Sequence, residues 1–157
     1  MALNYEIDNT DLGILNVLLK DANTPYTEIG EKLYVSSGTV HVRMKKMEKL
    51  GITRPPQIQL NTKKLGLDVI AFIGVYLNKS DQYDSVVKEL KKINEVVSCH
   101  YTTGNYSLFL KIICSDTDHL RRVLHDKLQK INGINRTETL ISLEESFERP
   151  IALSLRE

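Results

Sequence analysis

Apolar residues in the first third of the chain recur at helical spacing and predict two amphipathic helices separated by a break. The first helix begins after Asp8, whose carboxylate can cap free N–H groups. Its apolar face comprises Leu12, Leu15, Leu18 and Leu19. Thr24-Pro25 then interrupts the pattern, because a residue before proline avoids the α region. A second, short helix is predicted from its cap, Thr27, to Leu33.

A third helix is predicted from Ser36, its cap, to Leu50. Its apolar residues Val40, Met44 and Met47 fall at i, i+4 and i+7, which places them on one stripe of the helix. Two helices, a tight turn and a third helix make the order of a helix-turn-helix. In that motif the last helix enters the major groove of DNA.

Positive charge is concentrated on the third helix, although the chain as a whole is nearly neutral. The net charge of the 157 residues is +1. Residues 36–54 carry five cations and one anion, so their local net charge is +4. Phosphate binding needs such a focused basic surface, but a lysine-rich helix face is often only solvated surface. Charge alone therefore leaves both interpretations open.

The exposed side of the third helix supplies the candidate DNA contacts. Arg43 can read a guanine through two hydrogen bonds or grip a phosphate, and Thr39 and Val42 can touch a thymine methyl group. His41 has no second ligand at helical spacing, which favours a surface residue or a phosphate contact over a metal ligand. The predicted DNA-binding residues are Ser36, Ser37, Gly38, Thr39, His41, Val42, Arg43, Lys45 and Lys46.

The segment after the third helix is predicted to form a small wing from Ile52 to Leu60. Pro55-Pro56 removes two backbone donors there, which argues against a regular hairpin. Residues 1–60 are thus predicted to be a winged helix-turn-helix domain that binds double-stranded DNA. A linker over residues 61–68 follows.

From residue 69 onward, the pattern changes to alternating strands and helices. Strands are predicted over Val69 to Leu77, Val96 to Thr103, Tyr106 to Cys114 and Ile134 to Leu143. Helices are predicted over Asp81 to Ile93 and Asp116 to Ile131. The order βαββαβ is that of a ferredoxin-like domain over residues 69–157, so the fold class is α+β. Helices cover one face of such a sheet, and a second chain is the predicted cover of the other.

Hydrogen-bonding groups are concentrated between the second and third strands, in the string YTTGNYS. The hydroxyl groups of Thr102, Thr103 and Ser107, with the backbone of Gly104 and the amide of Asn105, can bind a zwitterion such as an amino acid. A hairpin turn with threonines chosen for their β propensity also explains this string, and on the string alone it is the favoured interpretation.

Catalytic and metal-binding patterns do not accompany these features. Cys99 and Cys114 lack ligand spacing and are expected to be two buried thiols, and no histidine stands in a nucleophile motif. We therefore expect a chain that is not an enzyme and needs no metal or cofactor. The longest apolar run, Val69 to Leu77, is too short to span a membrane, and the N-terminus lacks a signal-peptide pattern. A cytoplasmic protein is the expectation.

Ordered strings in both halves resemble the Lrp/AsnC family of feast/famine transcriptional regulators. The N-terminal strings are IDNTDLGIL (Ile7 to Leu15) and VSSGTVHVRMKKMEKLGI (Val35 to Ile52). The C-terminal strings are YTTGNYSLFLK (Tyr101 to Lys111) and TETLISL (Thr137 to Leu143), which are most similar to the asparagine-responsive branch of the family. The resemblance covers nearly the whole chain.

This resemblance implies a regulator whose DNA binding or assembly responds to an amino acid. Family members pair through the C-terminal domain, and their dimers often assemble into octamers or larger discs. Effectors lie between dimers near the turn after the second strand. Carried onto this chain, the effector-binding positions are Tyr101, Thr102, Thr103, Gly104, Asn105, Tyr106 and Ser107, with Glu138 and Thr139 on the last strand.

The identity of the effector and a rival function follow from the same residues. Many members carry an acidic residue shortly after the turn glycine, where this chain has Asn105 and Ser107. That departure favours asparagine or another polar amino acid over leucine. The rival is an amino-acid-sensing module that regulates an enzyme through protein contacts, with the N-terminal domain as an adaptor. Salt-dependent retention on DNA distinguishes the two.

Overall fold

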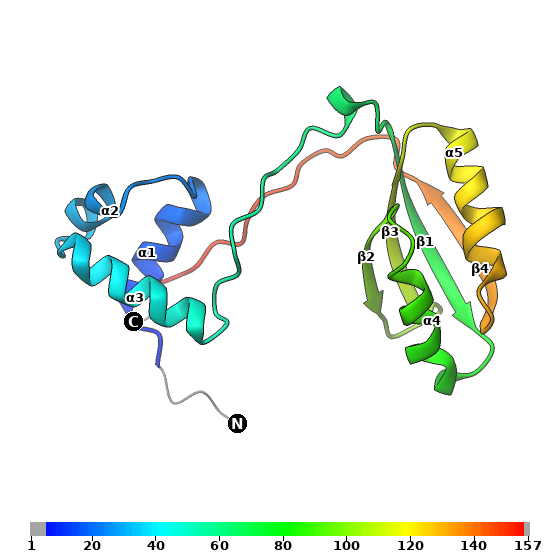
Figure 1. Cartoon of the computed structure of the whole chain (residues 1–157), viewed down its shortest axis with the longest axis horizontal. Helices are drawn as coiled ribbons and strands as arrows, with labels where there is room; N and C mark the ends of the chain where they lie inside the picture. Colours follow the sequence, from blue (N-terminus) through cyan, green and yellow to red (C-terminus); the bar gives the residue numbers. More distant parts are fainter. Residues whose placement is uncertain (1–5, 156–157) are drawn as a thin grey trace. The chain divides into compact units, whose positions relative to one another are not determined.

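The computed structural model describes residues 6–155, and it divides into two separately packed units. One unit contains the chain up to Gln59 together with the chain from Phe147 onward, and the other contains Leu60–Ser146 (Figure 1). The first five residues, which form part of the N-terminus expected to lack a signal peptide, lie outside the described part. Among residues 6–155, no helix is long and apolar enough to cross a membrane.

The first unit contains the three predicted helices, α1 (Asn9–Lys20), α2 (Tyr26–Leu33) and α3 (Ser37–Lys49). Asp8 caps α1: its carboxylate accepts the Asp11 N–H at 2.9 Å, and the Asp11 carboxylate accepts the Asp8 N–H at 3.2 Å. Ser36 caps α3, since its hydroxyl accepts the Thr39 N–H at 3.0 Å. The caps predicted at Asp8 and Ser36 are therefore confirmed.

The cap predicted at Thr27 is wrong, because α2 begins at Tyr26 and its N-cap position lies two residues earlier, at Pro25. Pro25 occupies the N-cap position in an extended conformation and makes no side-chain capping bond. The fixed φ of proline prepares the chain for the helix without a cap. Thr27 consequently lies inside the first turn of α2.

The core of this unit holds α3 against the other two helices. Its buried members are Ile14, Ile29, Val40, Met44 and Met47. The predicted stripe of α3 thus faces inward. The turn between α2 and α3 is tight, since a Cβ on Gly30 would lie 2.6 Å from the backbone oxygen of Val35. Only glycine allows this approach without a shift of the backbone.

The predicted wing contains no strand: residues 52 and 53 form a bend, and residues 54–60 have no regular secondary structure. Pro55-Pro56 lacks two backbone donors that a hairpin would use. A further departure from the predicted domains concerns the end of the chain. Residues from Phe147 onward belong to the helical unit, not to the ferredoxin-like one. The side chain of Asn16 explains this, since its amide donates to the Leu153 carbonyl at 2.9 Å and its oxygen accepts the Leu153 N–H at 3.3 Å.

The second unit is a four-stranded antiparallel sheet with helices on one face (Figure 1). Its strands are β1 (Val69–Leu77), β2 (Val96–Tyr101), β3 (Leu108–Cys114) and β4 (Ile134–Ile141), in the spatial order β2-β3-β1-β4. Its principal helices are α4 (Tyr83–Leu90) and α5 (Thr117–Arg122). The predicted α+β class and the βαββαβ order are confirmed.

Element ends differ from the predicted ones where the hydrogen-bond pattern changes. The second long helix continues from α5 as a π-helical turn over Val123–Lys127 and a 3₁₀ turn over Leu128–Lys130. Short 3₁₀ turns also cover Lys63–Leu65 and Ser80–Gln82. The hairpin predicted at Gly104-Asn105 is wider, because β2 ends at Tyr101 and β3 begins at Leu108.

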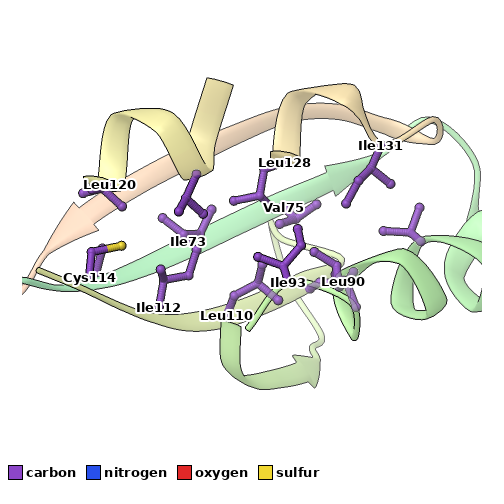
Figure 2. Packing of buried hydrophobic residues seen from close by; sticks show 14 residues of the cluster. Ile73, Val75, Leu90, Ile93, Leu110, Ile112, Cys114, Leu120, Leu128 and Ile131 are labelled. Atoms are coloured by element: carbon purple, nitrogen blue, oxygen red, sulfur yellow. The ribbon is translucent and has the colours of Figure 1, made fainter. Parts of the chain in front are cut away.

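The core of the second unit lies between the helices and one face of the sheet (Figure 2). Alternate residues of the central strands point into it, among them Ile73 and Val75 of β1 with Leu110 and Ile112 of β3. Cys114 is buried there, but Cys99, on the edge strand β2, is exposed, which corrects the expectation of two buried thiols. Within residues 6–155, no helix lies on the opposite face of the sheet.

Candidate functional site

The outward face of α3 carries the basic surface. Because a helix turns once in about 3.6 residues, Val42, Lys45 and Lys49 lie opposite the buried stripe. Val42 is 66% exposed, and both lysines are exposed. In a major groove, a side chain of the size of Val42 can contact bases while the lysines on either side contact phosphates. Lys49 was not among the predicted DNA-binding residues, although helical spacing alone places it on this face.

The first turn of α3 presents small side chains. Ser36, Ser37 and Gly38 are exposed, and the Thr39 hydroxyl lies 2.8 Å from that of Ser36. A Cβ on Gly38 would meet only the Ser36 hydroxyl at 3.6 Å, so the backbone there is open to an approaching partner. A hollow of about 510 Å³ adjoins this turn, lined by Asp8, Gly38, Thr39, Val42, Arg43 and Lys46.

Arg43 has partners inside the protein that its predicted role as a DNA contact did not include. Its Nη1 donates to Asp8 Oδ2 at 2.6 Å and to Asp11 Oδ1 at 2.9 Å, which ties α3 to the start of α1. The Asp11 side chain is fully buried, whereas 28% of the Arg43 side chain is exposed. The two carboxylates raise the pKa of Arg43. The pKa of Asp8 is lowered, first by the hydrogen bond from the Asp11 N–H and then by the nearby Arg43 guanidinium. Arg43 is thus engaged within the protein.

The remaining predicted residues of α3 occupy different surroundings. The His41 ring lies 5.9 Å, centroid to centroid, from the ring of Tyr26 and therefore borders the contact with α2. Lys45 is exposed, and Lys46 lines the hollow beside Arg43. Among residues 6–155, no group of three or more acidic, histidine or cysteine side chains could hold a metal ion.

The loop between β2 and β3 is closed by its own hydrogen bonds and tied to the end of β1. The Thr102 hydroxyl donates to the Tyr106 carbonyl at 2.8 Å. The Ser107 N–H donates to the Val75 carbonyl at 2.9 Å, and the Ser107 hydroxyl accepts the Leu77 N–H at 3.4 Å. The residues at the tip of the loop, Thr103, Gly104 and Asn105, are exposed, and Gly104 has a φ of 99° that favours glycine.

A polar and aromatic cluster lies beside this loop on the face of the sheet without helices. Glu138 of β4 accepts hydrogen bonds from the hydroxyls of Tyr106, at 2.8 Å, and Tyr76, at 3.0 Å. Arg136 pairs with Glu138 at 3.3 Å, and its guanidinium carbon lies 4.0 Å from the centre of the Tyr76 ring. The bonds from the tyrosines lower the pKa of Glu138, and the same carboxylate raises the pKa of Tyr106.

The predicted effector residues divide between the two faces of the sheet. Glu138 and Tyr106 come together, as described. Thr139 pairs with Ile73, whose side chain is in the core, so Thr139 points to the helical face. The Tyr101 ring also lies on that face, 4.8 Å from the ring of Tyr83 in α4. These two residues therefore do not join the cluster around Glu138.

Sequence reasoning missed two members of this cluster, Tyr76 and Arg136. Strand alternation supplied a signal for both. Arg136 lies two positions before Glu138 on β4, and it pairs with Tyr76 on the neighbouring β1. Residues two apart on a strand share a face, and directly paired residues are neighbours on it.

Comparison with known proteins supports this division of the chain into two functional parts. Residues 7–52 match the winged helix-turn-helix DNA-binding family, and residues 70–152 match the Lrp/AsnC ligand binding domain. Regulatory protein AsnC of Haemophilus influenzae is 45% identical over 147 residues, which cover 94% of this chain and 98% of that protein. Its counterpart in Escherichia coli is 44% identical over 94% of this chain and 97% of that protein. These relatives are named as regulators, not enzymes.

Solved structures agree with the relatives found by sequence. The structure of Escherichia coli AsnC superposes with a TM-score of 0.90 at 42% identity, covering 95% of this chain and all of that one. A transcriptional regulator of Neisseria meningitidis in complex with L-methionine has a TM-score of 0.87 at 25% identity, covering 95% of this chain and 97% of that one. The chain thus belongs to the Lrp/AsnC family and is a DNA-binding transcriptional regulator.

Proposed function

We propose that this regulator binds DNA through the outward face of α3 and that a polar amino acid, asparagine, controls it from the loop between β2 and β3. The observation that carries the proposal is the pairing of two features on one chain. One is an exposed helix face with Val42, Lys45 and Lys49, and the other is the Glu138–Tyr106 cluster beside an exposed loop tip. Such a regulator acts where DNA is, which supports a cytoplasmic location.

The residues assigned to DNA are those of the outer face and first turn of α3. Ser36, Ser37, Gly38 and Thr39 allow the duplex to approach closely, and Val42 meets bases. Lys45, Lys46 and Lys49 meet phosphates. Arg43 is reassigned as a residue that positions α3. His41, whose ring lies near Tyr26, is assigned a phosphate contact at the edge of the α3 surface.

The residues assigned to the effector follow from the charges of a zwitterion. The carboxylate of Glu138 suits an ammonium group, and the guanidinium of Arg136 suits a carboxylate. The exposed Asn105 and Thr103 can exchange hydrogen bonds with a side-chain amide. The L-methionine complex of the Neisseria meningitidis regulator supports an amino acid as the class of ligand.

A second copy of the chain is the proposed cover of the helix-free face of the sheet. Phe72 and Phe109 stack there with ring centroids 5.8 Å apart, and Leu140 is 52% exposed. A dimer built on this face gives two copies of α3, which can enter successive major grooves about 34 Å apart. Further assembly into octamers remains part of the proposal. Phe109→Glu should yield a monomer by light scattering, and an unchanged mass would contradict this interface.

Binding selection from a random DNA pool, followed by affinity measurement at several salt concentrations, tests the DNA-binding part. The affinity should fall with salt, with a log–log slope of about −0.9 for each phosphate contact. Lys45→Ala combined with Lys49→Ala should make the log–log slope shallower by the amount expected for about two phosphate contacts. Lys20→Ala, at the end of α1, should leave the slope unchanged. No DNA retention at low salt would favour a module that acts through protein contacts.

Calorimetric titration with each of the twenty amino acids tests the effector part. Asparagine should release or absorb heat with the wild-type protein. Glu138→Gln should weaken binding, because a neutral amide lacks the negative charge that attracts the ammonium group of the ligand. Glu89→Gln, on α4, is the matched control. Equal binding by the wild type and Glu138→Gln would remove the cluster from the effector site.

A further inference from the structure

Tyr34 stands in the turn between α2 and α3 in a conformation that tyrosine rarely adopts. Its φ of 56° and ψ of 41° are left-handed, and within residues 6–155 it alone among non-glycine residues has a positive φ. The turn requires this geometry, because the next residue, Val35, donates its N–H to the Gly30 carbonyl at 2.9 Å and thereby closes the end of α2. Glycine would adopt the same conformation without the steric cost of a Cβ.

Nothing in the described protein compensates for this cost. The Tyr34 residue is 96% exposed, and its ring and hydroxyl take part in none of the ring contacts or hydrogen bonds formed within residues 6–155. A large aromatic side chain normally stabilises a fold by being buried and packed, and an exposed one does not. A residue that breaks a local conformational preference without a structural gain is expected to serve a function outside the folded chain.

The position of Tyr34 identifies the partner. It lies two residues before Ser36, the cap of α3, and it lines a hollow of about 490 Å³ together with Ser37, Thr27 and Gly30. A duplex that contacts the exposed first turn of α3 must also pass this phenol. Glu31 lines the other part of the hollow, so a phosphate has to approach from the α3 side. There the phenol hydroxyl can donate to a phosphate oxygen while its ring lies against a sugar.

We propose that Tyr34 contacts the sugar-phosphate backbone of DNA next to the bases that face α3. This inference rests on the DNA-binding function proposed for the α3 surface and adds a contact supplied by the turn before it. An interface with a second protein is the competing use of an exposed tyrosine. The hydroxyl groups of Thr27 and Ser37 beside it make a polar surround that suits phosphate better than an apolar protein surface.

The experiment compares stability with affinity, using a DNA site selected by the wild-type protein. Tyr34→Phe removes the hydroxyl and should weaken binding about tenfold, the loss expected for one hydrogen bond to a charged group. The log–log slope of affinity against salt should stay that of the wild type, because a neutral hydroxyl displaces no counterion from a phosphate. Tyr34→Gly should bind more weakly still, although its midpoint of thermal unfolding should equal or exceed that of the wild type. Tyr83→Phe, which removes a tyrosine hydroxyl in the other unit, should change neither quantity.

Opposite signs for stability and affinity are the decisive result, because a purely structural residue would move both in the same direction. Wild-type affinity in both Tyr34 variants would overturn the proposal, and so would a change in assembled mass that accounts for the weaker binding. Failure of the wild-type protein to select any DNA would instead refute the DNA-binding proposal itself. The two failures are therefore distinguishable.

Discussion

Replacement of Arg43 by alanine is expected to destabilise the N-terminal unit by about 2–3 kcal/mol, and this figure follows from the two ion pairs. The pair with Asp8 is half exposed on the carboxylate side and contributes at most about 1 kcal/mol. The pair with Asp11 is different, because that side chain is fully buried. Loss of one partner of a fully buried pair costs about 3–5 kcal/mol. The exposure of Arg43 and the retained bond from the Asp8 N–H reduce this to about 2 kcal/mol.

Chemical denaturation followed by circular dichroism measures the effect, and Lys45→Ala is the matched control. Lys45 is an exposed cation two positions away, so its replacement should change the unfolding free energy by less than about 0.5 kcal/mol. A double-mutant cycle with Asp11→Ala should return a coupling energy above about 1 kcal/mol. If Arg43→Ala unfolds like the wild type yet binds DNA poorly, the positioning role is refuted and base reading by Arg43 is restored.

Three further outcomes test other parts of the structure. Gly30→Ala should destabilise the helical unit by about 1–3 kcal/mol, measured by denaturation, since its Cβ would collide with a backbone oxygen of the turn. Burial raises the pKa of Glu95, but the 2.7 Å and 2.8 Å bonds from Lys127 and other bonds outweigh it and lower that pKa to about 2. Stability from Glu95, about 3 kcal/mol, should therefore be complete above pH 4.5 and vanish as the pH falls through 2, a dependence that Glu95→Gln should flatten in acid titrations. Gly74→Ala should displace the Tyr106 ring that covers it and abolish the heat of effector binding, while an unaltered titration would separate that ring from the site.

Local features of the sequence predicted most elements, because their causes are local. Asp8 and Ser36 cap helices through bonds to residues three positions on, and the stripe from Val40 to Met47 follows helical spacing. The ferredoxin-like order follows from the succession of strands and helices. Each of these signals lies within a few residues of the structure that it determines.

Features that depend on distant residues could not be predicted in the same way. The partners of Arg43 lie 32 and 35 positions earlier in the chain, so spacing around α3 gave no sign that its guanidinium is occupied. Asn16 binds Leu153, which lies 137 positions later in the chain, and this contact joins the end of the chain to the helical unit. The separation of Thr139 from Glu138 follows from the pairing of β4 with β1, which the sequence did not specify.

Connectivity suggests how an effector at the sheet can influence DNA binding. β1 and β4 are neighbours in the sheet, and each continues toward the helical unit, β1 through the residues that precede it and β4 through the residues that follow it. Glu138 belongs to β4 and accepts a hydrogen bond from Tyr76 of β1, so the proposed effector on this carboxylate would contact a group shared by both strands. At the far end of the second connection, the Asn16–Leu153 bonds attach the chain to α1. Because coupling requires an element that both sites bias, we expect any coupling between the proposed effector site and the helical unit to pass through both connections, not through a single linker.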